Sequence, residues 1–446
     1  MIFSPNFWVP YAKRWSVIQR SLPSHLTQTP AMSTPQQSTW QEVEIYSLPD
    51  HILMEVFSIL TFSSDESRLH APSTLSHVSS RWRTVALNAS SLWTFIVVTF
   101  PFAAGQIARA KAGLKRSNGQ PIDVHIDVRD PEWTWELDED QHPMRPIFMV
   151  DIMQWLGPSH PRWRSLTVLT DTWTPMHIFL GYSTMFSSLP KLEQLSLNRC
   201  NSFTGLPDAP CPVPSDPIEL FGGNAHLPRL RHVTLAGVHV NYSCTGFEGL
   251  ISLDLRHQQY SVSPTIRQLR QLLHASPGLQ SLSLIALNPP SDGPDKDDGL
   301  PIFLPHLKIL TLGWWFVEDA VKFLQALQLP VVENLVLEDI APALLRNNHI
   351  ARDSTPILET LVKMGNRPYD PAFPSSFPSH LRRLTMSGVL LDPTALYRFI
   401  PLFMNLGELE LRSVQRGLVQ VIDCSEGIAG MEVVDSSVAS VILRSC

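Results

Sequence analysis

The feature of this 446-residue chain that most constrains its fold is a short apolar pattern, LxxLxL, that recurs after Gln120. In each copy the second and third apolar positions are two residues apart, so both side chains point to one side of a short strand and the residues between them point to the other. Neighbouring copies begin about 25 to 29 residues apart over much of the chain. Clear copies begin at Leu192, Leu250, Leu279, Leu307 and Leu406, looser ones at Trp163, Leu230, Val332 and Leu381, and a degenerate one at Leu358.

The segments between these strands change to a helical period. Apolar residues within 266–273, 317–327 and 396–403 are three or four positions apart, which places them on one helical face. This alternation and the repeat length resemble leucine-rich repeats. The resemblance implies an α/β fold, a curved leucine-rich-repeat solenoid with parallel strands on its concave side and helices on its convex side.

The resemblance to leucine-rich repeats extends from Pro121 to about Val414. We expect Pro121 to Val128 to form the first strand and Met431 to Arg444 to form a last repeat. Three residues after the last leucine of each copy lies another usually apolar position, which Cys200 occupies in the first clear copy. Asparagine or cysteine is common there in leucine-rich repeats, so we expect Cys200 to pack in the core.

A second informative stretch runs from Leu48 to Trp93. Its first half predicts one helix with a common apolar face formed by Ile52, Leu53, Val56, Phe57 and Leu60, and Pro49 suits the first turn. After the polar segment 63–73, a helical stripe continues through Leu75, Val78, Trp82, Val85 and Leu87. The LP start, the aliphatic helix and the RWR sequence at 81–83 resemble the F-box, a helical module that docks on the Skp1 adaptor of cullin-based ubiquitin ligases.

Two departures from the F-box pattern affect the interpretation of this stretch. Ser80 stands where the family often has cysteine, and we interpret 63–73 as a loop insertion, which costs little free energy because loop-closure entropy grows slowly with length. The alternative is an ordinary two-helix fragment that buries its apolar face in the chain's own core. The resemblance implies that Skp1 contacts Leu48, Pro49, Ile52, Leu53, Val56, Phe57 and Trp82.

Several of these seven residues are expected to be exposed until a partner covers them, because they exceed what two helices can bury alone. A few apolar anchors usually dominate an interface. We therefore expect aspartate at Leu53 and Phe57 to abolish Skp1 binding and to leave the repeats folded.

The exposed side of the predicted strands is the candidate surface for a target protein. The residues between the leucines carry mixed charges on neighbouring strands, which favours a polar, charge-complementary peptide or protein over a lipid. The alternative is a solvated face that binds nothing. The candidate target-binding residues are Asp254, Arg256, Glu338, Arg383, Glu408, Glu410 and Arg412.

Composition limits the other classes of function. The formal charge of −7 comes from 34 basic and 41 acidic residues spread along the chain, so no basic stripe indicates nucleic acid. The longest apolar run, 95–104, is too short to span a bilayer. The five cysteines form no CxxC pair and predict reduced thiols without a disulfide framework or zinc site.

No phosphate loop, nucleophile elbow or zinc-binding helix occurs in the sequence, and the acidic run 292–299 is interpreted as a solvated loop. We therefore expect neither a catalytic group nor a cofactor nor a metal.

Residues 1–41 differ from the rest in having no Asp or Glu. This composition overlaps with that of organelle transit peptides, so a mitochondrial leader, a disordered tail and an extension upstream of a start at Met32 all stay open. We favour the tail. The predicted organisation is a disordered tail at 1–41, an F-box at 42–98 and leucine-rich repeats at 99–446.

The order of the segments resembles that of the F-box-like proteins numerous in fungi: an F-box, a WTFI segment, a helix at 104–117 and then repeats. This resemblance implies a substrate receptor of an SCF-type ubiquitin ligase in the cytoplasm or nucleus. The F-box would bind Skp1 and, through it, a cullin, and the repeats would hold a target protein that the sequence does not identify. A scaffold acting outside a ligase and an enzyme without a local motif remain as alternatives.

Overall fold

The computed structural model describes residues 48–134, 138–200, 217–223, 225–258, 263–286, 301–340, 353–365, 380–392, 395, 399, 405–412, 431–436 and 440–445. It divides the chain into two units, Met1–Pro49 and Asp50–Cys446, and every helix and strand below belongs to the second. The predicted tail, the acidic run 292–299, most of the predicted helix 396–403, Cys211, Cys424 and Cys446 lie outside the described residues.

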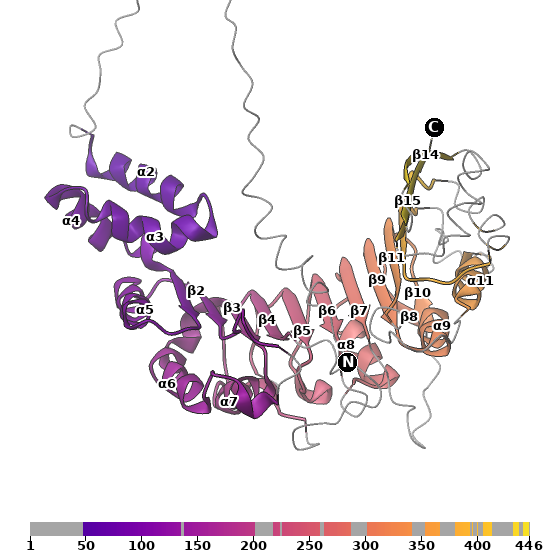
Figure 1. Ribbon diagram of the computed structural model, residues 1–446, viewed down its shortest axis with the longest axis horizontal. Helices are drawn as coiled ribbons and strands as arrows, with labels where there is room; N and C mark the ends of the chain where they lie inside the picture. The colour runs from indigo at the N-terminus through magenta and orange to yellow at the C-terminus, as the bar shows by residue number, and fades with distance from the viewer. Residues whose placement is uncertain are drawn as a thin grey trace, which may run out of the picture. The chain divides into compact units, whose positions relative to one another are not determined.

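The first elements are helices α2 (Asp50–Phe62), α3 (Asp65–Leu75) and α4 (Ser80–Asn88) and the 3-10 helix η3 (Ser90–Trp93) (Figure 1). Helix α3 occupies the segment predicted to be a loop insertion, so that prediction was wrong. The side chain of Ser64 caps α3 by accepting a hydrogen bond from the Ser67 N–H, and two acids in the first turn favour the helix. Only Pro72 and Leu75 of α3 are buried, so the sequence showed no apolar period there.

Thirteen of the described strands form one sheet, in which neighbouring strands from β1 to β13, without β8 and β10, follow chain order and run parallel. Their bounds are β1 Phe95–Thr99, β2 Ile122–Asp127, β3 Trp163–Thr170, β4 Gln194–Arg199, β5 His232–Ala236, β6 Ser252–Arg256, β7 Ser281–Ile285, β9 Ile309–Trp314, β11 Asn334–Asp339, β12 Arg383–Ser387 and β13 Glu408–Arg412. A separate parallel pair joins β8 (Ile302–Phe303) to β10 (Leu327–Gln328).

The two ends of this sheet differ from the prediction. The expected first strand is present as β2, but β1 precedes it and pairs with it. The segment expected to be a last repeat instead forms two antiparallel strands, β14 (Met431–Ser436) and β15 (Ser440–Ser445), and β15 also pairs antiparallel with β13. The leucine pattern therefore predicted most of the parallel strands and not the hairpin that follows them. Its degenerate copy at Leu358 lies in helix α11 and forms no strand.

The helices between strands lie along one side of the sheet (Figure 1). Their bounds are α5 Ala104–Arg116, α6 Pro146–Leu156, α7 Trp173–Ser183, α8 Ile266–His274, α9 Val317–Ala326 and α11 Thr355–Gly365, with 3-10 helices η4 Glu139–Gln141, η5 Gly157–Arg162, η7 Leu220–Gly222 and η8 Tyr242–Cys244. Helices α5, α8 and α9 confirm three predicted helices. Helix α8 begins with a capping box between Thr265 and Gln268.

The core lies between the sheet and these helices. One apolar residue from each of nine successive strands occupies the same position in the ladder, and each is at most 1% exposed. They are Leu166, Leu195, Val233, Leu253, Leu282, Leu310, Leu335, Leu384 and Leu409. In β4, Leu195 and Leu197 are buried, whereas Ser196 and Asn198 between and after them are only half-buried. The predicted strand register is thus confirmed.

The N-terminal helices join the sheet through a buried carboxylate on β2, Asp123. Arg164 of β3 donates to it from Nε and Nη2 over 2.9 and 2.6 Å, and Arg68 of α3 donates to it as well. The guanidinium of Arg68 also lies 4.3 Å from the ring centroid of Phe95 in β1. Burial alone would raise the pKa of Asp123, but the hydrogen bonds and charges of the two arginines outweigh it and hold the pKa below its ordinary value.

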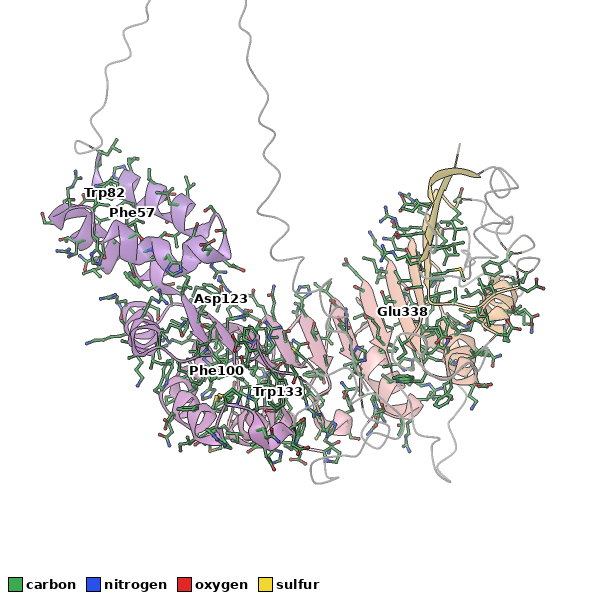
Figure 2. All side chains as sticks on the ribbon, viewed as in Figure 1. Phe57, Trp82, Phe100, Asp123, Trp133 and Glu338 are labelled. Atoms are coloured by element: carbon green, nitrogen blue, oxygen red, sulfur yellow. The ribbon has the colours of Figure 1, made fainter. Side chains whose placement is uncertain are left out.

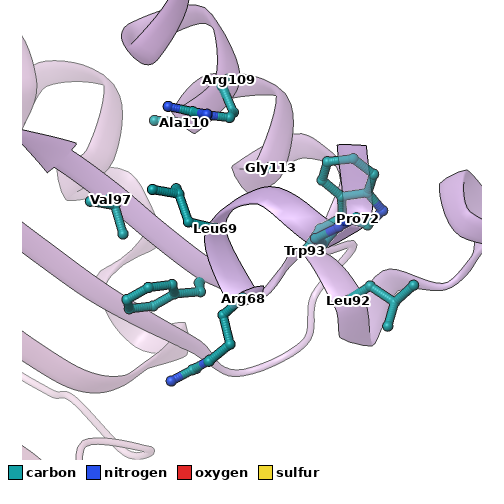
Figure 3. Close-up of a pocket in the computed structure, with 10 residues that line it drawn as sticks. Arg68, Leu69, Pro72, Leu92, Trp93, Val97, Arg109, Ala110 and Gly113 are labelled. Atoms are coloured by element: carbon teal, nitrogen blue, oxygen red, sulfur yellow. The ribbon is translucent and has the colours of Figure 1, made fainter. Parts of the chain in front are cut away.

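The same junction contains a small hollow between α3, η3, β1 and α5 (Figure 3). It is lined by Arg68, Leu69, Pro72, Leu92, Trp93, Phe95, Val97, Arg109, Ala110 and Gly113. Most of these are apolar residues that pack the helices onto the sheet. The hollow therefore belongs to the packing between the first helices and the first strand.

We predict that Asp123→Asn destabilises the protein by about 2 kcal/mol at pH 7, because two charged hydrogen-bond donors lose their anionic acceptor. The pKa of Asp123 is lowered by folding, so its stabilisation is fully present above the ordinary pKa near 3.8 and is lost as the pH falls through the folded value. Urea unfolding of wild type and variant at a series of pH values measures the difference. Asp151→Asn, at an exposed position of α6, is the matched control, and equal losses in both variants would contradict the role of Asp123.

Candidate functional site

The RWR sequence at the start of α4 folds the N-terminal helices together. The ring of Trp82 packs on that of Phe57 from α2, with centroids 4.9 Å apart, and both side chains are buried (Figure 2). Arg81 donates from Nη2 to Oδ1 of Asp50 over 2.6 Å, and Arg83 donates from Nε to the Ser76 carbonyl over 3.0 Å. The Arg81 pair is exposed and contributes little free energy, so the aromatic contact is the main tie between α2 and α4.

The structure divides the seven residues predicted to contact Skp1 between the inside and the outside of these helices. Leu53 and Phe57 have no exposed surface and Trp82 has 9%, so these three are not among the several residues expected to be exposed. Pro49 and Ile52 are exposed, whereas Leu48 and Val56 are half-buried. The side chains that the sequence indicated as the strongest anchors for a partner therefore form the interior of the N-terminal helices.

Helix α2 carries a second apolar stripe beside its buried one, and the sequence interpretation did not separate the two. Ile52, Val56 and Ile59 are three or four positions apart and share a face. Ile52 is 38% exposed and Ile59 70%. The signal was available, since α2 has more apolar residues than one face accommodates. The other exposed large apolar side chains of these helices are Met54, Leu60, Phe62 and Val78.

The second candidate surface is the face of the sheet opposite the core. On β3 to β5 this face carries mostly uncharged residues, among them Ser165, Thr167, Ser196, Asn198 and Thr234, all half-buried. On β2 it carries Asp123 and Asp127, which pair with arginines. Charged side chains gather on β6 and on β11 to β13, where all seven predicted target-binding residues lie. Arg383 and Arg412 are exposed, and Asp254, Arg256, Glu338, Glu408 and Glu410 are half-buried.

Six of these seven residues form ion pairs within the face. Arg256 donates from Nε to Oδ1 of Asp254 over 2.7 Å, two positions back on β6. Arg412 makes the equivalent bond with Glu410 on β13 over 2.6 Å. Arg383 of β12 pairs with Glu408 of β13 over 2.9 Å. The charges on the face are thus largely neutralised by one another.

Glu338 on β11 is the seventh residue of this set (Figure 2). No ion pair in the described part of the chain involves it. Burial raises the pKa of Glu338, and the charges of Arg256 and Arg412 oppose the rise without cancelling it. Its carboxylate is therefore partly dehydrated and incompletely compensated.

A further group of polar residues lies where β2, β3 and β4 end. The Met144 N–H donates to Nδ1 of His142 over 3.1 Å, so Nε2 of His142 bears the proton and donates to Asp171 over 3.2 Å. Asp171 also accepts the Asp130 N–H over 2.6 Å. These bonds fix the chain after β2, where Trp133 packs edge-on against His142 with centroids 4.7 Å apart (Figure 2). These polar residues therefore have a structural role, which is to hold the chain that follows β2.

Cys200 lies near this group and was predicted to pack in the core. It is half-buried, and burial raises the pKa of its thiol to about 11. A thiol with this pKa is protonated at neutral pH and is a poor nucleophile. Among the residues that the structure describes, no group of three or more His, Cys, Asp and Glu side chains has the geometry to hold a metal ion.

None of the described helices is long and apolar enough to cross a membrane.

Two comparisons with known proteins bear on these surfaces. A search of curated proteins found no match to the chain. The sequence profile of the F-box-like family matches residues 45–99, which include α2, α3, α4, η3 and the edge strand β1. The chain therefore carries an F-box-like domain at residues 45–99.

Proposed function

We propose that this protein is a substrate-receptor subunit of an SCF-type ubiquitin ligase. The observation that carries the proposal is the F-box-like domain at 45–99 with an apolar stripe exposed on α2. F-box domains generally bind Skp1, and Skp1 would connect the chain to a cullin. The receptor contributes no catalytic group of its own and acts in the cytoplasm or nucleus.

Skp1 docks on the exposed stripe of α2 in this proposal. Ile52, Val56 and Ile59 present a continuous apolar surface on one helix, the kind of surface that partners cover. Leu53, Phe57 and Trp82 act indirectly, because they pack inside the domain and hold α2 in place. The proposed docking set thus keeps Ile52 and Val56 from the sequence prediction, adds Ile59, and leaves out the buried Leu53, Phe57 and Trp82.

The sheet and its helices form a leucine-rich-repeat solenoid in this proposal, and the charged face binds the target. Strands in chain order, a constant register and helices on one side support this assignment. Such a receptor acts by position, since it raises the effective concentration of target lysines near the ubiquitin-charged enzyme. The ion-paired face suits a polar protein segment more than a lipid.

A scaffold that acts outside a ligase would use the same two surfaces. Co-purification of a cullin with the tagged full-length protein supports the ligase subunit, and recovery of Skp1 without a cullin supports the scaffold. The measurement is made with wild type and with the variants described next.

We predict that the double variant Ile52→Asp, Ile59→Asp lowers the affinity for purified Skp1 by about 100-fold or more. Buried apolar anchors in an interface each contribute about 2 kcal/mol or more, and aspartate at either position would be dehydrated without a partner. Calorimetric titration with Skp1 measures the change. Both positions are exposed, so the domain should stay folded.

Met54→Asp is the matched control for this pair. Met54 is also an exposed apolar residue of α2, but it is two positions from Ile52 and thus about 200° around the helix. This variant should keep the wild-type affinity. Unchanged affinity of the double variant would show that Skp1, if it binds, uses another surface.

We predict that reversing all four charges of Asp254, Arg256, Glu410 and Arg412 abolishes capture of target proteins and preserves Skp1 binding. Each strand keeps one acid and one base two positions apart, so the local ion pairs and the fold are retained. Affinity capture from cells with ligase activity blocked, read by mass spectrometry, measures the loss.

The control for this variant exchanges Glu359 and Lys363, an exposed ion pair on α11 outside the face. It should capture the same proteins as wild type. Capture of that same set by the four-charge variant would place target recognition elsewhere.

A further inference from the structure

The register of the strands aligns three charged residues that are far apart in the sequence in one row across the sheet. Arg256, Ile285, Gly313, Glu338, Ser387 and Arg412 are successive partners across β6, β7, β9, β11, β12 and β13. Neighbouring strands are about 4.8 Å apart, so Arg256 and Arg412 start roughly 14 and 10 Å along the row from Glu338. Glu338 therefore lies between two arginines, with no other charged residue of the row separating them.

The position beside Glu338 on β9 is Gly313, which has no side chain. A Cβ atom there would lie 3.0 Å from Cγ2 of Ile285, so the isoleucine closes the space from the far side. On the other side the row continues with Ser387, a small residue. Glu338 is thus flanked along the row by two residues with small or no side chains, of which Gly313 is buried and Ser387 half-buried. Glu338 itself is half-buried, so part of its side chain is accessible from outside.

Among the seven charged residues of β6 and β11 to β13 on this face, one carboxylate has no ion pair within the described part of the chain. Arg256, Arg383 and Arg412 are paired with Asp254, Glu408 and Glu410. Glu338 is half-buried, and the two nearest arginines already serve their own carboxylates. A cation brought to Glu338 by a partner would form a charge-assisted hydrogen bond in a partly dehydrated setting, where such bonds are strong.

We propose that the face binds an extended segment of the target protein that places a lysine or arginine side chain on the carboxylate of Glu338. This inference rests on the proposed target-binding role of the face. The row from Arg256 to Arg412 is roughly 24 Å long, which about seven residues of extended chain would span. A site of this length suits a peptide chain and not a small cation.

A phosphorylated or acidic segment is the competing occupant, and it would bind Arg256 or Arg412. Each of these arginines is within 2.7 Å of a carboxylate on its own strand, so an incoming anion would have to break an existing ion pair. The lysine or arginine segment breaks none. The charge arrangement therefore favours the basic side chain.

The test uses the purified full-length protein and immobilised degenerate 11-residue peptide libraries at physiological salt. The libraries differ only in a fixed central residue, which is lysine, arginine, alanine, glutamate or phosphoserine. Wild type should retain at least about tenfold more on the lysine and arginine libraries than on the alanine library, since a hydrogen bond to a charged group contributes this much. Glu338→Gln should reduce that ratio to within twofold, and Glu338→Lys should shift the preference to glutamate.

Glu359→Gln is the matched control, because it makes the same substitution on α11 and should leave the ratio unchanged. Thermal melting of Glu338→Gln should not fall below wild type, since the variant removes a partly dehydrated charge. A wild-type preference for glutamate or phosphoserine, an absence of preference, or a lysine preference that survives Glu338→Gln would overturn the inference.

Skp1 binding by the same preparations separates this inference from the proposed function. Glu338→Gln should bind Skp1 as wild type does. If wild type selects lysine through Glu338 and fails to bind Skp1, the ligase role fails and the peptide site stands. If it binds Skp1 and a cullin and shows no selection through Glu338, the ligase role stands and the peptide site fails.

Discussion

The buried row of leucines that crosses the parallel sheet is the constraint on which the rest of the structure depends. Leu195, Leu253, Leu335 and Leu409 hold equivalent ladder positions although they are widely separated in sequence. A slip of one residue in any strand would move its leucines to the outside. The register that buries this row also aligns the residues between the leucines, so the row containing Arg256, Glu338 and Arg412 on the opposite face is a consequence of the core.

The F-box-like domain packs directly against this sheet and contributes its first strand. Residues 45–99 end in β1, which pairs in parallel with β2, and Arg68 of α3 reaches the β2 carboxylate of Asp123. The indole N–H of Trp93 donates to the Ala86 carbonyl over 2.8 Å, and Arg116 of α5 stacks over the Trp93 ring. The exposed stripe on α2 and the face of the sheet therefore belong to one packed unit, Asp50–Cys446. The proposed receptor role, which acts by position, needs such a connection.

The parts that the sequence predicted are those with a repeated local signal. Alternating leucines predicted most of the parallel strands and their register, and the helical period predicted α2, α4, α8 and α9. Helix α3 was missed because its stability comes from the cap at Ser64 and from Pro72 and Leu75 packing on other elements, which gives no period. The exposed stripe of α2 was not separated from the buried one, because Ile52 and Leu53 are neighbours in an apolar run. Packing against Trp82 shows which residues face inward.

The state of Glu338 was beyond sequence analysis for a related reason. It depends on Arg256 and Arg412, which are more than seventy positions away along the chain, and on the two acids that already pair with them. Spacing within one repeat contains no information on such pairing between repeats. The sequence therefore indicated a charged face, and the packed sheet was needed to show that Glu338 is the charged residue of the predicted set without an ion pair in the described part of the chain.

The two candidate surfaces differ in the physical origin of binding, and this difference suits their proposed roles. An apolar stripe such as that of α2 gains affinity from area removed from water, which depends little on salt or on the identity of a polar partner. The mutually paired charges of the sheet face add little net affinity, because a partner that binds one of them must replace a bond that already exists. What they provide is selectivity, since most incoming charges meet an occupied position. Persistent attachment to one adaptor and discriminating, reversible attachment to targets require these two kinds of surface in one chain.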